Sequence, residues 1–336
     1  MTTIGITMGC PTGIGPEIIL RYFMARRWPA GLQPIVLGDI GVLKRCAAEL
    51  NLQDSCTSWQ PGNEPIQGTT PVLPLSDLDA QAIQWGQPNK ATAHAMVHYI
   101  ETAVRLTQDG FLQGITTCPI SKDALNNAGY NFPGHTEMLA NLTSSSNYAM
   151  MMAGQSLKVT LVTIHCPLAK VPELLTPDAV FTLIMTTSDA LRNDFGIATP
   201  RIAVAGLNPH AGENNLFGTE EGSSIVPAIE KACKKNVAVS GPYPPDTVFF
   251  KATKGHFDAV VCMYHDQGLI PFKLLHFHDG VNVTLGLPIV RTSVDHGTGY
   301  DIAGKGVASA ESLSEAVQLA ADISTNRAAV QTTENS

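Results

Sequence analysis

The sequence predicts an α/β protein with a largely parallel sheet. Short apolar runs alternate with longer segments of helical periodicity along the 336 residues, which is the pattern of strands joined by crossover helices. Apolar residues make up 44% of the chain and charged residues only 15%, so a chain of this length can bury a large core. The expected strands, in chain order, are Ile4–Met8, Pro34–Leu37, Ile115–Thr117, Val159–Ile164, Arg201–Leu207, Ala259–Met263 and Val281–Leu285.

The longer segments between these strands carry the signals of helices. One opens with Thr-Pro-Asp at 176–178, which supplies an N-cap, a proline suited to the first turn and an acidic residue at the positive end of the helix dipole. The others have apolar residues that recur at helical spacing. The expected helices are 176–196, Asn89–Gln108 and Leu313–Ile323.

Two segments show neither pattern. Residues 60–75 are rich in proline and are expected to be irregular, and the polar residues 326–336 are expected to fray. No linker divides the chain, so a division into two domains must be discontinuous. We expect one domain from residues 1–128 plus 266–330 and a second from 129–265.

Composition excludes several classes of function. The formal charge of -8 argues against a nucleic-acid-binding surface, because phosphate backbones bind to basic faces. No apolar run reaches the roughly 18 residues that a membrane span requires, and the N-terminus does not resemble a signal peptide. The seven scattered cysteines form no disulfide framework, which favours free thiols in the cytoplasm.

A glycine-rich segment, Gly9–Glu17, directly follows the first strand and opens a helix. Gly13 and Gly15 allow the backbone to turn tightly, and such a junction can present N–H groups to an anion. The spacing matches neither of the common phosphate-binding fingerprints. An anion site and a plain tight turn therefore both fit this segment.

Three histidines each lie just beyond an apolar strand: His165, His210 and His265. In open α/β sheets ligands bind at the carboxyl ends of the strands. One such histidine usually hydrogen-bonds a loop carbonyl, but three in equivalent positions favour a metal site, since neutral imidazole is a good ligand for zinc and its neighbours.

Other polar residues could bind a small anionic substrate. His135 and Thr136 stand in a Gly-His-Thr-Glu segment, where Thr136 could equally cap the helix that follows. Arginine and lysine are natural partners of phosphate. Lys273 and Arg291 are therefore candidates to bind the substrate, together with Asn282, which lies between them in the sequence. A structural ion pair is the ordinary alternative for Arg291.

A glycine-rich loop, Asp295–Gly306, precedes the last predicted helix. Such a loop suits a nucleotide-binding edge, where the backbone must pass close to adenine and ribose; a merely flexible loop is the alternative. The candidate cofactor-binding residues of this loop are Asp295, His296, Gly297 and Asp301, to which Gly13 and Gly15 are added.

Taken together, these motifs resemble the 4-hydroxythreonine-4-phosphate dehydrogenase family of vitamin B6 biosynthesis. The resemblance runs nearly end to end, through Gly-Ile-Gly-Pro-Glu, Gly-His-Thr-Glu, Asn-Pro-His-Ala-Gly-Glu, Met-Tyr-His-Asp-Gln-Gly and Arg-Thr-Ser-Val-Asp-His-Gly-Thr. It implies a fold similar to isocitrate and isopropylmalate dehydrogenases, with two α/β/α domains and a cleft between them. Residues 1–128 and 266–330 would form the cofactor side, and 129–265 the metal, substrate and dimerisation domain.

The same resemblance implies the ligands and their residues. His165, His210 and His265 would bind one divalent metal, shared across a homodimer interface; zinc is favoured, with magnesium, cobalt, manganese or nickel as alternatives. NAD or NADP would lie along the Asp295–Asp301 loop. The implied substrate-binding residues are His135, Thr136, Lys273, Asn282 and Arg291.

The implied reaction oxidises 4-hydroxythreonine 4-phosphate at its 3-hydroxyl and decarboxylates the β-keto product to 3-amino-2-oxopropyl phosphate. A sister branch converts 4-phospho-D-threonate or 4-phospho-D-erythronate to dihydroxyacetone phosphate and CO2, and these motifs resemble it as well. Asp246, Asp266 and Lys273 are the catalytic candidates, the two aspartates as general base or as residues that orient a neighbour.

Two other classes of protein compete with a dehydrogenase. A three-histidine zinc hydrolase would need a metal-bound water but no nucleotide loop, so the Asp295–Gly306 segment argues against it. A non-catalytic metabolite-binding protein would fit if the first loop were degenerate. That loop has Cys10 and Thr12 where the family commonly has an acidic residue and an alanine, which removes a charge near the expected site.

Overall fold

The computed structural model describes residues 1–132 and 134–334 and has the expected α/β architecture. The chain divides into two compact units, each assembled from two separate stretches. Unit 1 comprises Met1–Ser146 and Leu287–Thr325, and unit 2 comprises Asn147–Gly286 together with the residues from Asn326 on.

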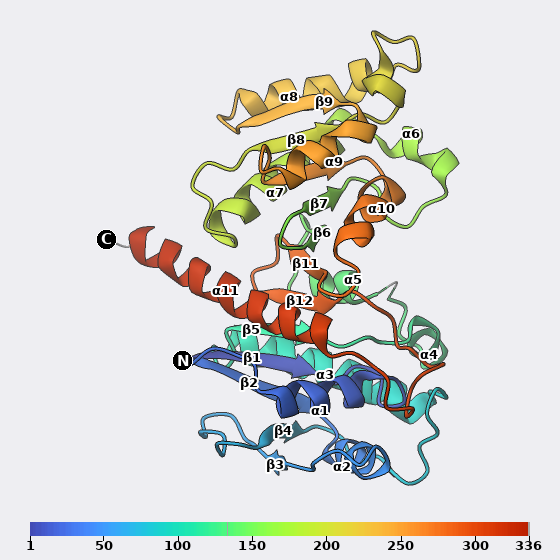
Figure 1. Cartoon of the computed structure of the whole chain (residues 1–336), viewed down its shortest axis with the longest axis vertical. Helices are drawn as coiled ribbons and strands as arrows, with labels where there is room; N and C mark the ends of the chain where they lie inside the picture. The colour runs from blue at the N-terminus through green and yellow to red at the C-terminus, as the bar shows by residue number, and fades with distance from the viewer. Residues whose placement is uncertain (133, 335–336) are drawn as a thin grey trace. The chain divides into compact units, whose positions relative to one another are not determined.

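Unit 1 is built on parallel strands in the order β3-β4-β2-β1-β5-β12. The helix α3 packs against β1, β2 and β5 (Figure 1). It begins after Asn89, whose side chain accepts a hydrogen bond from the Thr92 amide in a capping box. The elements of unit 1 are β1 Thr2–Thr7, α1 Gly15–Ala25, β2 Leu32–Gly38, α2 Ile40–Glu49, β3 Cys56–Ser58, β4 Thr70–Pro74, α3 Lys90–Gln108, β5 Gly114–Thr117, α4 Lys122–Asn127, α5 His135–Leu142 and β12 Arg291–Val294.

Unit 2 has the strand order β11-β6-β7-β10-β8-β9. Here β6 runs antiparallel to both β11 and β7, and the remaining neighbours are parallel. Its elements are β6 Ala149–Ala153, β7 Lys158–Leu161, η1 Leu168–Lys170, α6 Val171–Leu174, α7 Pro177–Asn193, β8 Ile202–Ala205, η2 Pro209–Gly212, η3 Glu221–Ile225, α8 Val226–Cys233, β9 Val239–Tyr243, α9 Pro245–Thr253, β10 Ala259–Cys262, α10 His265–Leu275 and β11 Val281–Leu285.

Each unit has its own apolar core. In unit 1, Met96 and Ile100 of α3 are buried with Ile35 of β2 and Leu139 of α5. In unit 2, Val159 and Val260 from neighbouring strands are buried with Phe272 of α10. Strands of this kind are covered on both faces, which explains why the sequence showed continuous apolar runs rather than alternation.

The unit boundaries fall later in the chain than the expected breaks after residues 128 and 265. Packing is the reason. The helix α5 contributes Met138 and Leu139 to the core of unit 1, so it stays with the preceding residues. The helix α10 packs on β7 and β10, and β11 pairs with β6, so both stay in unit 2.

Two local expectations were wrong. Residues 60–75 are not wholly irregular, because Thr70–Pro74 forms β4 and pairs with β2 and β3. The C-terminal segment does not fray at residue 326, because α11 runs from Glu311 to Glu334. In the part of the chain that the structure describes, no helix is long and apolar enough to span a membrane.

Candidate active site

Two of the three predicted metal ligands, His165 and His265, lie side by side in unit 2. They follow β7 and β10, which are parallel neighbours, so their loops leave the sheet at the same edge. Their ring centroids are 5.7 Å apart. Both residues line a hollow of about 440 Å³ together with Cys166, Tyr264 and Asp266.

The carboxylate of Asp266 fixes the orientation of the His265 ring. Its Oδ1 lies 2.7 Å from Nδ1 of His265. An ionised carboxylate only accepts hydrogen bonds, so Nδ1 is the donor in this contact and Nε2 is the ring nitrogen on the other side. This contact is compatible with Asp266 as a residue that orients a neighbour, and both roles considered for it stay predictions.

The histidine pair suits a divalent metal of the zinc type. An imidazole nitrogen ligates zinc at about 2.0–2.1 Å, and two such ligands on one ion place their ring centroids roughly 5–6 Å apart. The observed separation of 5.7 Å therefore fits. Among the described residues, however, no group of three or more His, Cys, Asp or Glu side chains is close enough to hold an ion.

The third predicted ligand, His210, lies on a separate turn of unit 2. It follows β8, the other parallel neighbour of β10, and its ring lies 6.1 Å from that of Phe217. His210 is exposed and has φ +54°. The left-handed conformation costs an ordinary residue roughly 1–2 kcal/mol, and such strain concentrates at functional sites.

Three more predicted residues lie on other elements of unit 2. Asp246 is exposed in the first turn of α9, a helix that contacts the η2 turn carrying His210. Lys273 is in the last turn of α10, with Nζ 5.8 Å from the Phe277 ring. Asn282 is half-buried on β11. Their roles toward a substrate stay predictions.

Unit 1 brings together His135, Thr136 and Arg291. Arg291 begins β12 and is buried, and its Nη2 donates to Oγ1 of Thr117 across 2.8 Å. His135 and Thr136 open α5, whose N-cap Gly134 has no side chain to accept the first N–H groups. The sequence predicted these three residues as neighbours of an anion, and they share one unit.

Electrostatics at this cluster favour an anionic ligand. Burial lowers the pKa of His135 well below its usual range, and the charges of Arg291 and Lys122 lower it further. The ring is therefore neutral. Its Nε2 is buried and has no hydrogen-bond partner among the described residues. Burial also lowers the pKa of the Arg291 guanidinium, to about 9, against the opposing influence of Glu137. An anion placed here would offset these costs.

Lys122 and Thr117 were missed by the sequence reasoning. A Cβ built on Gly134 would lie 4.0 Å from Nζ of Lys122 and 3.4 Å from Oε2 of Glu137, so an ammonium and a carboxylate both stand at the start of α5. Thr117 ends β5, and its hydroxyl accepts from Arg291. The only sequence signal was position, since both residues stand at or just after the end of a strand.

The Asp295–Gly306 loop is tied to the start of the chain at both ends. The Ile14 amide donates to the Thr298 carbonyl across 3.0 Å. Arg21 donates to the Gly306 carbonyl across 2.5 Å. A loop held in this way is not merely flexible, which was the alternative interpretation of its glycines.

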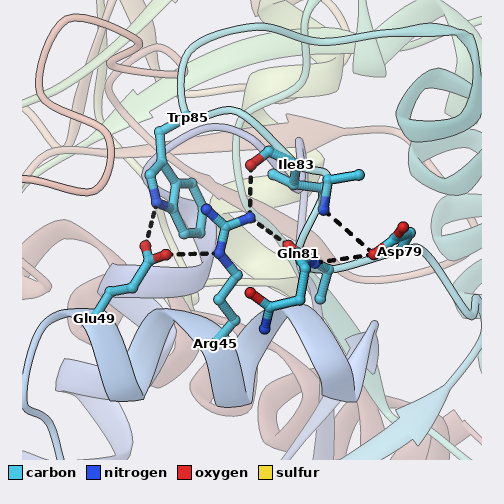
Figure 2. A network of polar contacts seen from close by, with 8 residues as sticks. Arg45, Glu49, Asp79, Gln81, Ile83 and Trp85 are labelled. Carbon is cyan, nitrogen blue, oxygen red and sulfur yellow. Dashed lines mark hydrogen bonds and ion pairs between the residues drawn. The ribbon is translucent and has the colours of Figure 1, made fainter.

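Trp85 packs directly beneath the loop. A Cβ at Gly304, where φ is +73°, would come within 2.4 Å of the indole ring, so only glycine fits there. The indole N–H donates to Glu49 across 2.6 Å, and Nε of Arg45 donates to the same carboxylate across 2.7 Å. Figure 2 shows this network, in which Arg45 also reaches the Ile83 carbonyl.

The predicted cofactor residues fall into two groups. Asp295, His296, Gly297 and Asp301 stand on the tethered loop; Gly297 and Asp301 are exposed. Gly13 and Gly15 stand on the first loop, where the backbone packs closely. A Cβ at Gly13 would lie 2.8 Å from the Thr298 carbonyl, and one at Gly15 would lie 2.1 Å from that of Met8. The binding of a cofactor by these six residues stays a prediction.

Cys10 is fully buried and faces other side chains of unit 1. Its Sγ lies 3.3 Å from the Thr12 hydroxyl and accepts from the Tyr300 hydroxyl across 3.3 Å. The thiol in the first loop therefore has hydrogen-bonding neighbours and leaves no unpaired gap.

Known proteins are similar to this chain over nearly its whole length. The family profile "Pyridoxal phosphate biosynthetic protein PdxA" matches residues 30–320. The 4-hydroxythreonine-4-phosphate dehydrogenase of Desulforapulum autotrophicum is 52% identical over 320 residues, 95% of this chain and 94% of that protein. The D-threonate 4-phosphate dehydrogenase of Cupriavidus necator is 43% identical, covering 98% of this chain and 99% of that one. A crystal structure of 4-hydroxythreonine-4-phosphate dehydrogenase from Klebsiella pneumoniae has a TM-score of 0.88 at 40% identity, covering 96% and 100%.

The fold, the clustered polar residues and these relatives define an enzyme of the dehydrogenase class. Within that class the chain belongs to the family of the pyridoxal phosphate biosynthetic protein PdxA, as the profile match over most of its length shows. The resemblance noted from the sequence motifs is thereby confirmed.

Proposed function

We propose that this enzyme oxidises 4-hydroxythreonine 4-phosphate at its 3-hydroxyl and decarboxylates the β-keto product to 3-amino-2-oxopropyl phosphate. The observation that carries the proposal is the polar cluster of unit 1, where Arg291 is buried near His135 and Nε2 of His135 has no hydrogen-bond partner among the described residues. The relative that is 52% identical bears the name of this activity.

The cluster suits the phosphate group of the substrate. Arg291 offers a planar fork of donors, Lys122 a point charge, and the first turn of α5 its N–H groups. The neutral His135 can donate or accept without adding charge. These residues would hold the substrate by its phosphate group. The reacting carbon is then already positioned, which lowers the entropic part of the barrier.

The residues predicted to hold the metal would act at the reacting end of the substrate. A divalent metal and NAD or NADP, when bound, supply a Lewis acid and a hydride acceptor. His165, His210 and His265 would hold the metal, with zinc favoured, and Asp266 would keep Nε2 of His265 available. Lys273 would pair with the carboxylate or phosphate of the substrate, with Asn282 beside it. Asp246 remains the candidate general base.

We further propose a homodimer in which the metal ligands are shared between subunits. Large apolar side chains around α10 support this, because Ile270, Leu274 and Phe277 are 60%, 81% and 68% exposed. Apolar surface of that kind marks contact sites in proteins. The seven free cysteines fit a reducing compartment, and we place the enzyme in the cytoplasm.

A second substrate class deserves the same assay, because D-threonate 4-phosphate dehydrogenases are 43% identical to this chain. The substrates of the two branches differ by an amino group in place of a hydroxyl at the second carbon. A zinc hydrolase, by contrast, gives no account of the tethered Asp295–Gly306 loop.

The test follows NAD(P)H absorbance with 4-hydroxythreonine 4-phosphate and, separately, with 4-phospho-D-threonate, each with and without EDTA. We expect turnover of the first substrate to exceed that of the second, and we expect chelation to abolish it. Preference for the threonate would assign the sister branch. Turnover that is unchanged after complete removal of metal would rule out the metal-dependent mechanism.

A further inference from the structure

The turn that carries His210 has an unusual backbone. Residues 210–215 all have positive φ, with values of 54°, 54°, 79°, 40°, 55° and 70°. Glycine visits this region freely, and asparagine and histidine are enriched there, but Ala211 and Glu213 do not adopt it readily. A left-handed stretch of this length persists only where the surrounding structure imposes it, so some group must hold it.

That group is the carboxylate of Glu221, at the start of the η3 turn. Its side chain is buried, and Oε1 accepts from the amides of Leu207 and Asn208 across 2.8 and 2.7 Å. Oε2 accepts from Nδ2 of Asn208 across 3.0 Å. One carboxylate therefore takes three N–H donors from the segment that leads directly into His210.

Two glycines let the backbone wrap around this carboxylate. A Cβ on Gly212 would lie 2.7 Å from Oε2 of Glu221. A Cβ on Gly206 would lie 2.8 Å from the Cα of Ala211 and 3.1 Å from Oε1. The turn thus closes on the Glu221 side chain, and neither Gly206 nor Gly212 could be replaced by a larger residue without a clash.

The base of the turn is also tied to the helix that begins with His265. Gln267 is buried in α10; its Nε2 donates to the Gly206 carbonyl across 2.6 Å, and its Oε1 accepts from the Met263 amide across 2.7 Å. The segment before His210 and the segment before His265 are therefore joined by one side chain.

We propose that Glu221 is a positioning residue for the metal site, which holds His210 in its left-handed turn so that the imidazole is presented as a ligand. The inference rests on the proposed role of His210. Residues that orient metal ligands typically change metal affinity by roughly 10- to 100-fold when they are removed, although they never touch the ion.

The experiment measures Co²⁺ binding to the full-length protein by its visible absorption, with no substrate or nicotinamide present. Glu221→Gln keeps the size of the side chain but turns an amide toward three donors. We expect it to weaken Co²⁺ affinity by roughly 10- to 100-fold and to alter the absorption bands. Glu230→Gln, on the exposed face of α8, removes the same charge and should change neither.

A double-mutant cycle shows whether Glu221 acts through His210. In a His210→Ala background, Glu221→Gln should cause no further loss of Co²⁺ affinity, because the ligand that it positions is gone. Equal losses in both backgrounds would mean that Glu221 supports the fold in general, and would overturn the inference. So would unchanged affinity in Glu221→Gln when His210→Ala alone weakens binding.

Failure of the proposed function gives a different pattern. If His210→Ala leaves Co²⁺ affinity unchanged, His210 is not a metal ligand. The proposed role of His210 and the proposed role of Glu221 then both fail. Should Glu221→Gln not fold, Asn208→Ala removes the side-chain donor to Oε2 of Glu221 together with its contact to Oε2 of Glu220, and leaves the two backbone donors to Glu221 in place. We then expect a smaller loss of affinity that again disappears in the His210→Ala background, and an equal loss in both backgrounds would overturn the inference.

Discussion

The hydroxyl of Tyr300 donates a hydrogen bond to Sγ of Cys10 across 3.3 Å. This contact joins the glycine-rich loop to the turn after the first strand, two segments separated by 290 residues. Burial and the neighbouring Cys10 raise the pKa of Tyr300, so its hydroxyl remains a donor. Cys10, which stands where the family commonly has an acidic residue, is thus a hydrogen-bond acceptor for Tyr300.

Tyr300→Phe should impair the cofactor side of the reaction. The variant loses the bond to Cys10 and the hydroxyl's contacts with Ser121 and Thr298. Loss of even one hydrogen bond, about 0.5–1.5 kcal/mol, should loosen the loop and raise KM for NAD or NADP by at least about 2- to 10-fold. KM for the phosphorylated acid should change less. Tyr130→Phe is the matched control, because its hydroxyl contacts His94 and not the loop. An unchanged cofactor KM in Tyr300→Phe would contradict the assigned role of the contact.

His135 should make stability depend on pH. Its pKa is lowered in the folded protein, whereas the unfolded value is about 6.5. Below that value the unfolded chain binds a proton that the folded chain does not, so the free energy of unfolding falls as the pH falls, by at most about 1.4 kcal/mol per pH unit. Urea unfolding of the native protein and of His135→Gln between pH 5 and pH 8 measures the effect.

The variant should lose part of that pH dependence, while His98→Gln, on the exposed face of α3, should retain it. Identical profiles in the native protein and His135→Gln would show that His135 is not the titrating group.

Arg291→Lys should weaken binding of the phosphorylated substrate while keeping the charge. Lysine cannot reproduce the planar fork or the bond to Thr117 at the same time. Loss of a charged hydrogen bond of about 1.5–3 kcal/mol raises KM roughly 10- to 100-fold. KM for the cofactor should be unaffected, and Arg105→Lys, exposed on α3, should behave like the native enzyme. Equal increases in both KM values would place Arg291 outside the phosphate site.

Arg327→Ala should destabilise unit 2. Arg327 binds the carboxylate of Asp194 through two contacts of 2.6 and 3.0 Å, and the Asp194 side chain is almost inaccessible. Removing the arginine leaves a buried, unpaired carboxylate, which costs about 3 kcal/mol. Adding Asp194→Ala should restore part of the loss in thermal unfolding. If the double variant Arg327→Ala, Asp194→Ala unfolded at a lower temperature than Arg327→Ala alone, this explanation would fail.

Local signals in the sequence correctly predicted the elements that determine the architecture. Each of the seven expected strands coincides with an observed one within a few residues, and Thr176 and Asn89 cap α7 and α3. These features depend on neighbours a few residues apart, through capping and apolar periodicity. Five observed strands were not predicted: β3, β4, β6, β9 and β12. Of these, β3 has three residues and β4 lies in a proline-rich segment.

The sequence by itself determined the family, the α/β class and the strand ends at which the histidines stand. Tertiary structure alone decided which of these residues meet. His165 and His265 are adjacent because β7 and β10 pair, and Lys122 joins His135 and Arg291 because α4, α5 and β12 share a unit. Glu221 had no sequence signal at all, since its partners depend on a left-handed turn. Contacts of this kind arise from packing between segments far apart in the chain, which local propensity does not encode.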